Sequence, residues 1–374
     1  MVYVVLMANV LIAAGGTGGH IYPALAIADA FKAARPDLSI EFVGTAHGLE
    51  NKIVPPKGYK VHHLPIGRLN SNVSLRERLT TLLLLPLAIF KSFLLIWREK
   101  PGFVLGVGGH ASGPLLLAAA LLRVRSAIWE PNAMPGMANR ILSRFVDESF
   151  VVFPEARSHL RGGRHKVAGM PVRQEIEDMP MSTDTGKSSP FKILIFGGSQ
   201  GARGLNNTVV EMVREGGEWL NTIHITHQTG AADFQRIQEA YGSSLSTAPV
   251  DLRDYLHDMG QQYAKADLVI CRSGTGTLSE LAACGKAAVL VPFPFAADDH
   301  QRKNAESLVN KGAALMILHK DLNPQSLRSV IERLQNNPEE RSRLRENIRK
   351  FHQPKAAQAL VSEFLERMPK HASC

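Results

Sequence analysis

The sequence places a histidine directly behind a run of glycines, in the stretch AAGGTGGH at residues 13–20. Glycines let the backbone approach a ligand closely, and a helix that starts behind them favours an anion such as phosphate. An imidazole exchanges a proton near neutral pH, which makes His20 a candidate general base. No Gly-Lys-Ser/Thr follows, and Ile21 stands where a dinucleotide fingerprint has its third glycine. The alternative is a plain tight turn with His20 at the surface.

A second turn repeats this pattern in the stretch GGHASGP at residues 108–114. It also follows an apolar run and precedes an apolar helix-like segment. If both runs are strands of one parallel sheet, the two turns lie at the same edge and face one crevice. His110 then binds an anionic group or caps the helix, and the sequence leaves both roles open.

Glu130 closes a further apolar run, 126–129, and is followed by Pro131 and Asn132. Carboxylates at strand ends often carry function in α/β folds, and an asparagine amide can hydrogen-bond a sugar. The structural alternative for Glu130 is a salt bridge with Arg140 or Arg144.

The second half of the chain contributes the turns GGSQGAR at 197–203 and RSGTGTLSE at 272–280. Small residues at a helix start predict a phosphate site, to which the Ser199 hydroxyl can donate. Glu280 is placed to accept hydrogen bonds from the two hydroxyls of a ribose, as carboxylates do in dinucleotide folds. The alternative is a first-turn glutamate that stabilises the helix by about 0.3–1 kcal/mol. Gln301 is a further candidate for sugar hydroxyls.

Short apolar runs that alternate with helix-like segments must position these turns. The expected strands are 9–14, 39–44, 59–64, 103–107, 126–129, 148–153, 166–169, 192–196, 223–226, 250–251, 268–271 and 287–292. Such alternation predicts two α/β halves, each with a parallel sheet, around a nucleotide-binding crevice. Residues 181–190 offer almost nothing to bury and read as a linker or exposed loop.

Composition limits the partners. The 374 residues are 45% hydrophobic and 21% charged, as in a folded globular protein. A formal charge of +9 favours an acidic partner, whereas 6% aromatic residues without basic interleaving argue against nucleic acid. The three cysteines, Cys271, Cys284 and Cys374, form no disulfide or metal pattern. Residues 1–6 do not read as a secretory signal, and either Met1 or Met7 could be the start.

The segment 75–97 is expected to be an amphipathic helix. Its apolar face comprises Leu79, Leu82, Leu83, Pro86, Phe90, Phe93, Leu94 and Trp97, and its basic neighbours are Arg76, Arg78, Lys91 and Arg98. A membrane span is rejected because Lys91 would cost about 2.5–3.5 kcal/mol in hydrocarbon and Pro86 would break the helix. We expect a helix that lies on an anionic membrane surface, with a buried domain helix as the alternative.

Taken together and in this order, the glycine turns resemble the MurG family of UDP-N-acetylglucosamine–N-acetylmuramyl-(pentapeptide) pyrophosphoryl-undecaprenol N-acetylglucosamine transferases, from Val10 to about Ala359. The resemblance implies a GT-B fold of two Rossmann-like α/β domains facing a cleft. The N-terminal domain, 1–175 with the returning helix 354–374, would face the acceptor and the membrane, and 176–353 would bind UDP-GlcNAc.

The resemblance also implies the reaction and its residues. GlcNAc would move with inversion to the C4 hydroxyl of the MurNAc of a lipid-linked acceptor, with His20 as general base, oriented by Glu130. The turn at Gly108, Gly109 and His110 would lie on the acceptor side. The substrate contacts would be Thr17, Gly18, Gly19, Asn132, Arg173, Ser199, Leu256, Thr275, Gly276, Thr277, Leu278, Ser279, Glu280 and Gln301.

No cofactor is expected, and no essential metal, because no Asp-x-Asp motif is found where a donor site would need one. The implied location is peripheral, on the cytoplasmic face of the bacterial inner membrane, with other cell-wall synthesis proteins as possible partners. Two other functions fit the turns. A UDP-GlcNAc 2-epimerase of the same fold would need no lipid-facing surface, and a non-catalytic nucleotide-sugar sensor would need neither His20 nor the second histidine turn.

Overall fold

The computed structural model describes residues 9–67, 74–179 and 190–366. The chain forms two compact units: unit 1 is Met1–Pro171 with Lys355–Cys374, and unit 2 is Val172–Pro354. The sequence predicts boundaries at 175/176 and 353/354. The predictions for the first six residues, for Met7, for nearly all of the expected linker and for Cys374 lie outside the described residues.

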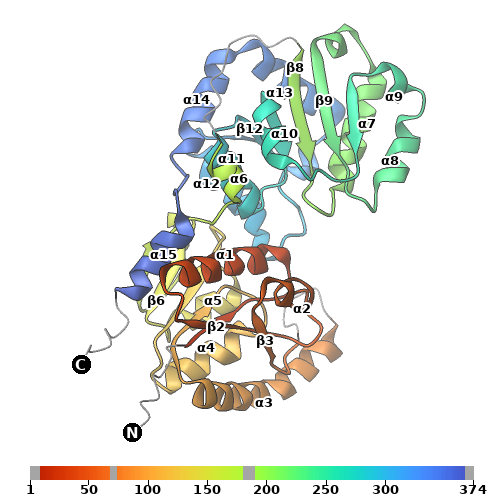
Figure 1. Cartoon of the computed structure of the whole chain (residues 1–374). Helices are drawn as coiled ribbons and strands as arrows, with labels where there is room; N and C mark the ends of the chain where they lie inside the picture. Colours follow the sequence, from red (N-terminus) through yellow and green to blue (C-terminus); the bar gives the residue numbers. More distant parts are fainter. Residues whose placement is uncertain (1–8, 68–73, 180–189, 367–374) are drawn as a thin grey trace. The chain divides into compact units, whose positions relative to one another are not determined.

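Unit 1 is built on a parallel seven-stranded sheet of order β3-β2-β1-β4-β5-β6-β7 (Figure 1). The strands are β1 Asn9–Ala13, β2 Ser39–Gly44, β3 Lys60–His63, β4 Pro101–Gly106, β5 Ser126–Glu130, β6 Glu148–Val151 and β7 Arg164–Val167. The helices are α1 Gly18–Ala34, α2 Glu50–Ile53, α3 Leu75–Glu99, α4 Ser112–Leu121, α5 Met137–Leu142 and α15 Ala356–Leu365. The expected strands of this half are therefore confirmed, with ends that differ by a few residues.

The central strand β1 is apolar from Val10 to Ala13 because both faces of the sheet are covered. Val10 and Ile12 pack with α1 and α15 in one core cluster. Leu11 and Ala13 point to the opposite face and pack with α3 and α4 in another. This alternation follows from the two-residue period of a strand, and it holds the turn after β1 rigidly at the sheet edge.

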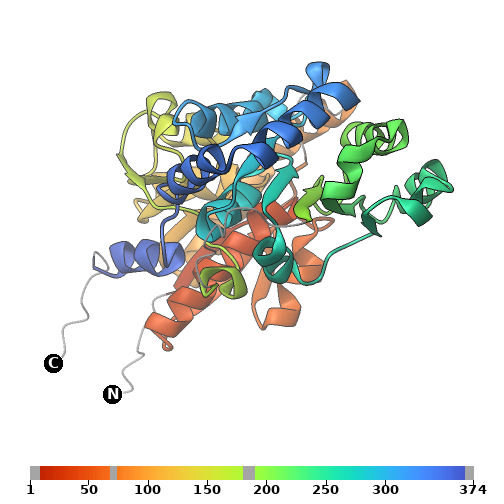
Figure 2. The same ribbon diagram turned by 90° about the horizontal axis from the view of Figure 1, so that it is seen from above.

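The helix α15 follows unit 2 in the sequence but packs on unit 1. Figures 1 and 2 show it beside α1. The ring of Phe364 lies 4.1 Å from that of Phe103, 4.9 Å from that of Phe150 and 5.8 Å from that of Phe31, measured between centroids. Aromatic burial of this kind anchors the end of the chain on the first sheet.

Helix α3 corrects one expectation, because it continues through Pro86 from Leu75 to Glu99. A proline removes one helical hydrogen bond, and here the freed carbonyl is that of Leu82. Both residues lie on the exposed side of the helix, so water can satisfy that carbonyl. The prediction of a break was wrong for this reason.

The apolar face of α3 is exposed, and only its other side is buried. Leu83 is 81% exposed and Trp97 is 74% exposed, whereas Leu95 and Ile96 pack into the core of unit 1. By length and composition alone, residues 76–99 would pass as a membrane span. The packed inner side instead makes α3 part of the folded unit, so the alternative of a buried helix of the first domain is correct for that side and wrong for the apolar face.

Unit 2 repeats the design with a parallel six-stranded sheet of order β10-β9-β8-β11-β12-β13. Its strands are β8 Phe191–Phe196, β9 Ile223–Gln228, β10 Val250–Arg253, β11 Leu268–Cys271, β12 Ala288–Leu290 and β13 Leu315–Met316. Its helices are α6 Gln174–Glu177, α7 Arg203–Glu215, α8 Phe234–Tyr241, α9 Ser244–Thr247, α10 Met259–Lys265, α11 Thr275–Cys284, α12 His300–Val309, α13 Pro324–Asn336 and α14 Pro338–Arg349. Gly285 ends α11 in the left-handed conformation, with φ 61°, as its position in the sequence predicts.

Candidate functional site

The two histidine turns of unit 1 touch each other at the edge of the sheet. This follows from β1 pairing directly with β4, so both turns leave neighbouring strands. A Cβ built on Gly109 would lie 2.7 Å from the Gly15 carbonyl oxygen, and one on Gly108 would lie 2.5 Å from the Cδ2 atom of His20. The structure thus brings His20 onto the backbone of the second turn, as the strand-end pattern predicts.

His20 lies in the first turn of α1, half-buried, with Thr17 as the residue before the helix. Its Nδ1 atom is 3.2 Å from the carbonyl oxygen of Gly15. A carbonyl only accepts, so this contact requires the proton on Nδ1 and makes Nε2 the basic nitrogen. That tautomer is the one a general base needs.

A carboxylate that sequence reasoning missed lies beneath the first turn. Glu50 opens the short helix α2 and is fully buried. Its Oε2 accepts from the Gly16 backbone N–H at 3.0 Å, and its Oε1 accepts from the Thr45 N–H at 2.7 Å. One backbone donor of the first turn therefore already serves a carboxylate rather than a ligand. The available signal was the spacing of Gly44, Thr45 and Glu50 directly after a predicted strand.

Glu130 is buried and holds its own loop. Its Oε1 accepts from the backbone N–H of Asn132 at 2.8 Å, and its Oε2 accepts from the N–H of Gly136 at 3.0 Å and from Asn139 Nδ2 at 2.9 Å. Burial raises the pKa of Glu130, against these hydrogen bonds, which lower it. The partners are amides of residues 132–139, so neither the expected contact with His20 nor the alternative salt bridge with Arg140 or Arg144 is found for Glu130. The structure thus places Glu130 as the support of Asn132 and does not bring it to the imidazole.

In unit 2, Arg173 and Tyr263 meet on the carboxylate of Glu280. Arg173 Nε donates to Glu280 Oε1 at 2.9 Å, and the Tyr263 hydroxyl donates to Oε2 at 3.0 Å. The neighbouring carboxylate outweighs the effect of burial and raises the pKa of Arg173. Two of the predicted substrate residues, separated by 107 positions in the sequence, are thus directly paired, and α11 carries the remaining turn from Thr275 to Ser279.

The start of α11 is joined to α12 through hydrogen bonds. The Ser273 hydroxyl donates to the Gln301 carbonyl at 2.8 Å, and Asn304 Nδ2 donates to Thr275 Oγ1 at 3.2 Å. The Gln301 side chain accepts from the backbone N–H of Phe293 at 3.0 Å. Gln301 is therefore fixed beside the fourth glycine turn, residues 272–280. Its amide nitrogen remains a donor that a sugar hydroxyl can use.

The third turn, 197–203, rests on a buried polar network. Asn206 Nδ2 donates to Asp233 at 2.8 Å and to the Thr229 carbonyl at 3.0 Å, and its carbonyl oxygen lies 3.2 Å from His227 Nε2. Arg236 donates to Asp233 and lowers its pKa to about 2, whereas burial lowers the pKa of His227 to about 3. The predicted Ser199 is exposed on this turn, and the predicted Leu256 is buried.

Comparison with known proteins places these sites in a family. The chain matches the glycosyltransferase family 28 N-terminal domain over residues 10–151 and the corresponding C-terminal domain over 192–360. It is 46% identical, over 96% of its length and 99% of the relative's, to the UDP-N-acetylglucosamine–N-acetylmuramyl-(pentapeptide) pyrophosphoryl-undecaprenol N-acetylglucosamine transferase of Bdellovibrio bacteriovorus. The chain belongs to the MurG family.

The MurG structure of Acinetobacter baumannii has the same fold, with a TM-score of 0.77 and 29% identity over 96% of this chain and 99% of that one. This match, with both family 28 domains, confirms the predicted GT-B class of two Rossmann-like α/β domains. A UDP-GlcNAc 2-epimerase of Neisseria meningitidis, solved with UDP-GlcNAc bound, reaches a TM-score of 0.65 at 16% identity. That likeness concerns the fold alone, so membership of the MurG family leaves the epimerase as a distant relative.

One group of side chains in the described parts of this MurG-family chain has the ligand types and spacing for a metal ion: Glu41, His62 and Glu99. Glu41 already lies 2.5 Å from His62 Nε2 and 3.3 Å from Lys60 Nζ. These partners lower the pKa of Glu41, against the effect of burial. The group belongs to β2, β3 and the end of α3, and it includes none of the predicted site residues.

Proposed function

We infer that this chain is an inverting N-acetylglucosaminyltransferase that moves GlcNAc from UDP-GlcNAc to the MurNAc of undecaprenyl-pyrophosphoryl-MurNAc-pentapeptide, in peptidoglycan synthesis. The observation that carries this inference is the match at 46% identity over nearly the whole of both chains to a relative with that name. Both substrates are those that the relative's name states. The match spans both units, so no part of the expected machinery depends on fold analogy alone.

The chemistry asks for one base and one site for the leaving group. The C4 hydroxyl of MurNAc attacks C1 of GlcNAc, the new C–O bond forms as the bond from C1 to the UDP oxygen breaks, and the configuration inverts. The hydroxyl proton passes to Nε2 of His20, and UDP leaves as an anion. The Nδ1–H contact with Gly15 supports this role, because it sets the tautomer that has Nε2 as its base.

Unit 2 is proposed to hold the donor. Each oxygen of the Glu280 carboxylate accepts one bond in the structure, from Arg173 and from Tyr263, and each oxygen has a further lone pair for a ribose hydroxyl. Arg173 beside it can neutralise a diphosphate oxygen. The other proposed donor contacts are Thr17, Gly18, Gly19, Asn132, Ser199, Leu256, Thr275, Gly276, Thr277, Leu278, Ser279 and Gln301.

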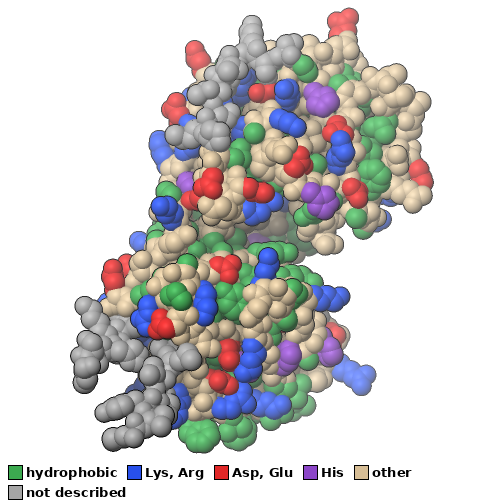
Figure 3. Space-filling view, in the orientation of Figure 1, with side chains coloured by type: hydrophobic (Ala, Val, Ile, Leu, Met, Phe, Trp, Pro, Cys, Tyr) green, Lys and Arg blue, Asp and Glu red, His purple; other side chains and the backbone are tan. Residues whose placement is uncertain are grey.

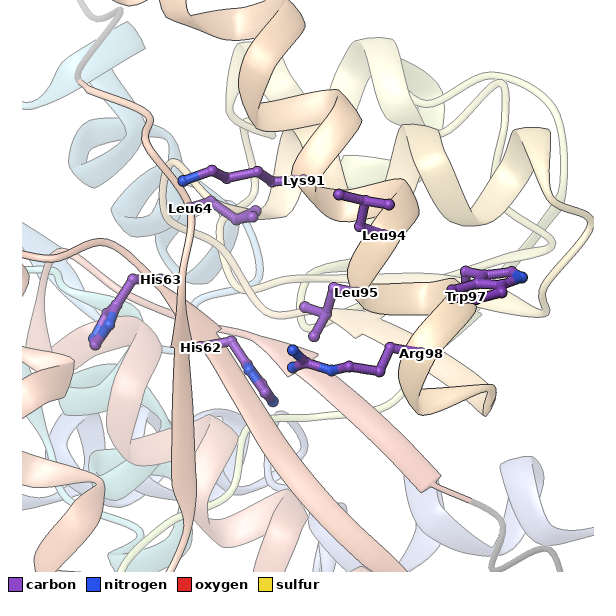
Figure 4. A pocket seen from close by; sticks show the side chains of 8 residues that line it. All are labelled: His62, His63, Leu64, Lys91, Leu94, Leu95, Trp97 and Arg98. Carbon is purple, nitrogen blue, oxygen red and sulfur yellow. The ribbon is translucent and has the colours of Figure 1, made fainter.

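The acceptor and its lipid are proposed to meet unit 1, with Gly108, Gly109 and His110 on the acceptor side. The exposed apolar face of α3 supports a location on an anionic membrane surface, and Figure 3 shows hydrophobic side chains with Lys and Arg along the lower edge of this unit. A pocket of about 400 Å³ flanks that face, and Figure 4 shows Arg98 of α3 facing His62 of β3, with Lys91 beside Leu64. Cations beside an apolar face suit an anionic membrane surface, which agrees with a peripheral position on the cytoplasmic face of the inner membrane.

A product assay with UDP-GlcNAc and a short-chain acceptor analogue tests the proposal. We expect release of UDP only when acceptor is present, with one GlcNAc added to the acceptor for each UDP released. Conversion of UDP-GlcNAc without acceptor would instead support the epimerase, and binding without turnover would support a sensor. Addition of EDTA is expected to leave the rate unchanged.

A further inference from the structure

A single peptide group joins Glu50 to His20. The N–H of this group belongs to Gly16 and donates to Glu50 Oε2 at 3.0 Å. The carbonyl of the same group belongs to Gly15 and lies 3.2 Å from His20 Nδ1. Because a peptide group is planar and conjugated, the two hydrogen bonds act on one rigid dipole.

The Glu50 carboxylate is built into its position. It is fully buried, and besides Gly16 it accepts from the backbone N–H of Thr45 and, at 3.2 Å, from the Thr45 hydroxyl. Three donors suit the ionised carboxylate, which only accepts. A Cβ on any of three surrounding glycines would lie within 2.7 Å of a Glu50 oxygen: Gly15, Gly44 and Gly48.

The imidazole is held as closely on its other side. Gly108 has φ +128°, and its backbone lies so near the His20 ring that an added Cβ would lie 2.5 Å from Cδ2. The contact of Nδ1 with the Gly15 carbonyl, at 3.2 Å, holds the ring from the first turn. The position of the ring therefore depends on the peptide group that Glu50 holds.

We propose that Glu50 is a positioning residue that acts on His20 through the peptide group between Gly15 and Gly16. The carboxylate polarises the amide, so the Gly15 carbonyl becomes a stronger acceptor for Nδ1–H. This fixes the tautomer, directs Nε2 to the acceptor hydroxyl and stabilises the imidazolium that forms when that proton is taken up. Glu50 gains no proton. Its task is that of the aspartate in a carboxylate–histidine pair, with one amide between the two groups.

The inference rests on the proposed role of His20 as general base, so its test needs a measurement without substrate. In the full chain labelled with 15N-histidine, the ring nitrogen shifts report the tautomer, and the His20 signals are identified by their loss in His20→Gln. We expect the Nδ1–H form in the unaltered chain and a mixture of tautomers in Glu50→Gln. Glu41→Gln is the control, because it removes a different carboxylate of unit 1, one that is partly rather than fully buried and pairs with His62, and it should leave the His20 signals unchanged.

Kinetics give the second readout. Glu50→Gln should lower kcat about 10–100-fold, the usual loss when a supporting carboxylate is removed, with KM for UDP-GlcNAc changed less than twofold. In a His20→Ala background, the same substitution should cost nothing further, because its effect passes through the imidazole.

An Nε2–H tautomer in the unaltered chain would overturn the proposal even if Glu50→Gln failed to fold. So would an unchanged tautomer in Glu50→Gln, or a loss of kcat that adds in full to that of His20→Ala. A chain that transfers no GlcNAc would refute the proposed function instead, and the tautomer experiment would still decide whether Glu50 holds His20.

Discussion

The first glycine turn, 13–20, and the third, 197–203, have the same local pattern but rest on different side chains. Both leave a central parallel strand, contain a glycine with φ near +85° and start a helix. Beneath the first lies the buried Glu50 carboxylate, which accepts from the Gly16 N–H. Beneath the third lies Asn206, which donates to the buried Asp233 carboxylate, and Asp233 pairs with Arg203 at the end of that turn rather than accepting from its backbone.

This difference separates two kinds of chemistry. The Glu50 carboxylate occupies the Gly16 N–H of the first turn and repels a phosphate there, whereas Asp233 under the third turn is paired with Arg203 and Arg236. We therefore expect the first turn to present the base and the third turn to contribute more to binding of the diphosphate. A shared strand–glycine–helix pattern does not by itself indicate a shared ligand.

The largest effect is expected from His20→Ala, which removes the proposed base of the first turn. Loss of a general base typically lowers kcat about 10²–10⁴-fold. His63→Ala is the control, because His63 lies on the same sheet and bonds Asn51. Steady-state release of UDP measures both variants, and near-normal turnover in His20→Ala would remove the first turn from the chemistry.

Glu280→Gln tests the donor side of the comparison. The neutral amide is a weaker acceptor for ribose hydroxyls and also weakens the pairing with Arg173, so KM for UDP-GlcNAc should rise about 10–100-fold, equivalent to about 1.4–2.8 kcal/mol. Tyr263→Phe, which removes only the hydroxyl bond to Oε2, should have a smaller effect. Calorimetric titration with UDP separates binding from turnover, and unchanged affinity would place the ribose elsewhere.

The apolar face of α3 offers a test in unit 1 alone. Leu83→Glu places a charge where an 81% exposed leucine would enter the membrane surface, and binding to anionic liposomes should fall about 10-fold. Binding of the unaltered chain should weaken with salt. Leu121→Glu is the control, because Leu121 is an exposed leucine on α4, 63% accessible. Sedimentation with liposomes measures both, and an equal loss in both variants would contradict a specific role for α3.

Two matched glycine substitutions sharpen the comparison between the turns. Gly16 and Gly198 have φ of +85° and +86°, and an added Cβ meets nothing within 4 Å at either. Alanine at each position should therefore carry a similar strain of about 1–2 kcal/mol. Gly16→Ala should mainly lower kcat, and Gly198→Ala should mainly raise KM for UDP-GlcNAc. The same kinetic change in both would mean that the two turns serve one purpose.

The buried network of Asn206, Asp233 and His227 beneath the third turn should make the folding stability depend on pH. Burial lowers the pKa of His227 to about 3, so the unfolded chain binds a proton below its ordinary pKa of 6.5 and the folded chain does not. The contribution of His227 to folding stability is therefore fully present above pH 6.5. It decreases as the pH drops toward 3, by at most about 1.4 kcal/mol per pH unit. Urea unfolding from pH 7 to pH 4 measures this, and His227→Gln should flatten the slope. An unchanged slope would show that this imidazole does not control it.

The sequence by itself determined the strands, the glycine turns and the class of fold. Apolar runs of four to six residues between turn residues are compatible with few structures other than buried strands. The helices between these runs make the strands parallel. It also predicted His20 and Glu280 as site residues from their types and their places at helix starts, whereas Arg173 was predicted only through the family resemblance.

Only the tertiary structure decided what lies under and beside these residues. Glu50 reaches the first turn across 34 positions of sequence, and Arg173 reaches Glu280 across 107. Glu130 was expected to orient His20 in the reaction of the family, but its hydrogen bonds hold its own loop. The continuation of α3 through Pro86 was equally beyond local pattern. Local sequence encodes the conformation of a turn, whereas its charge and its partners depend on segments that only folding brings together.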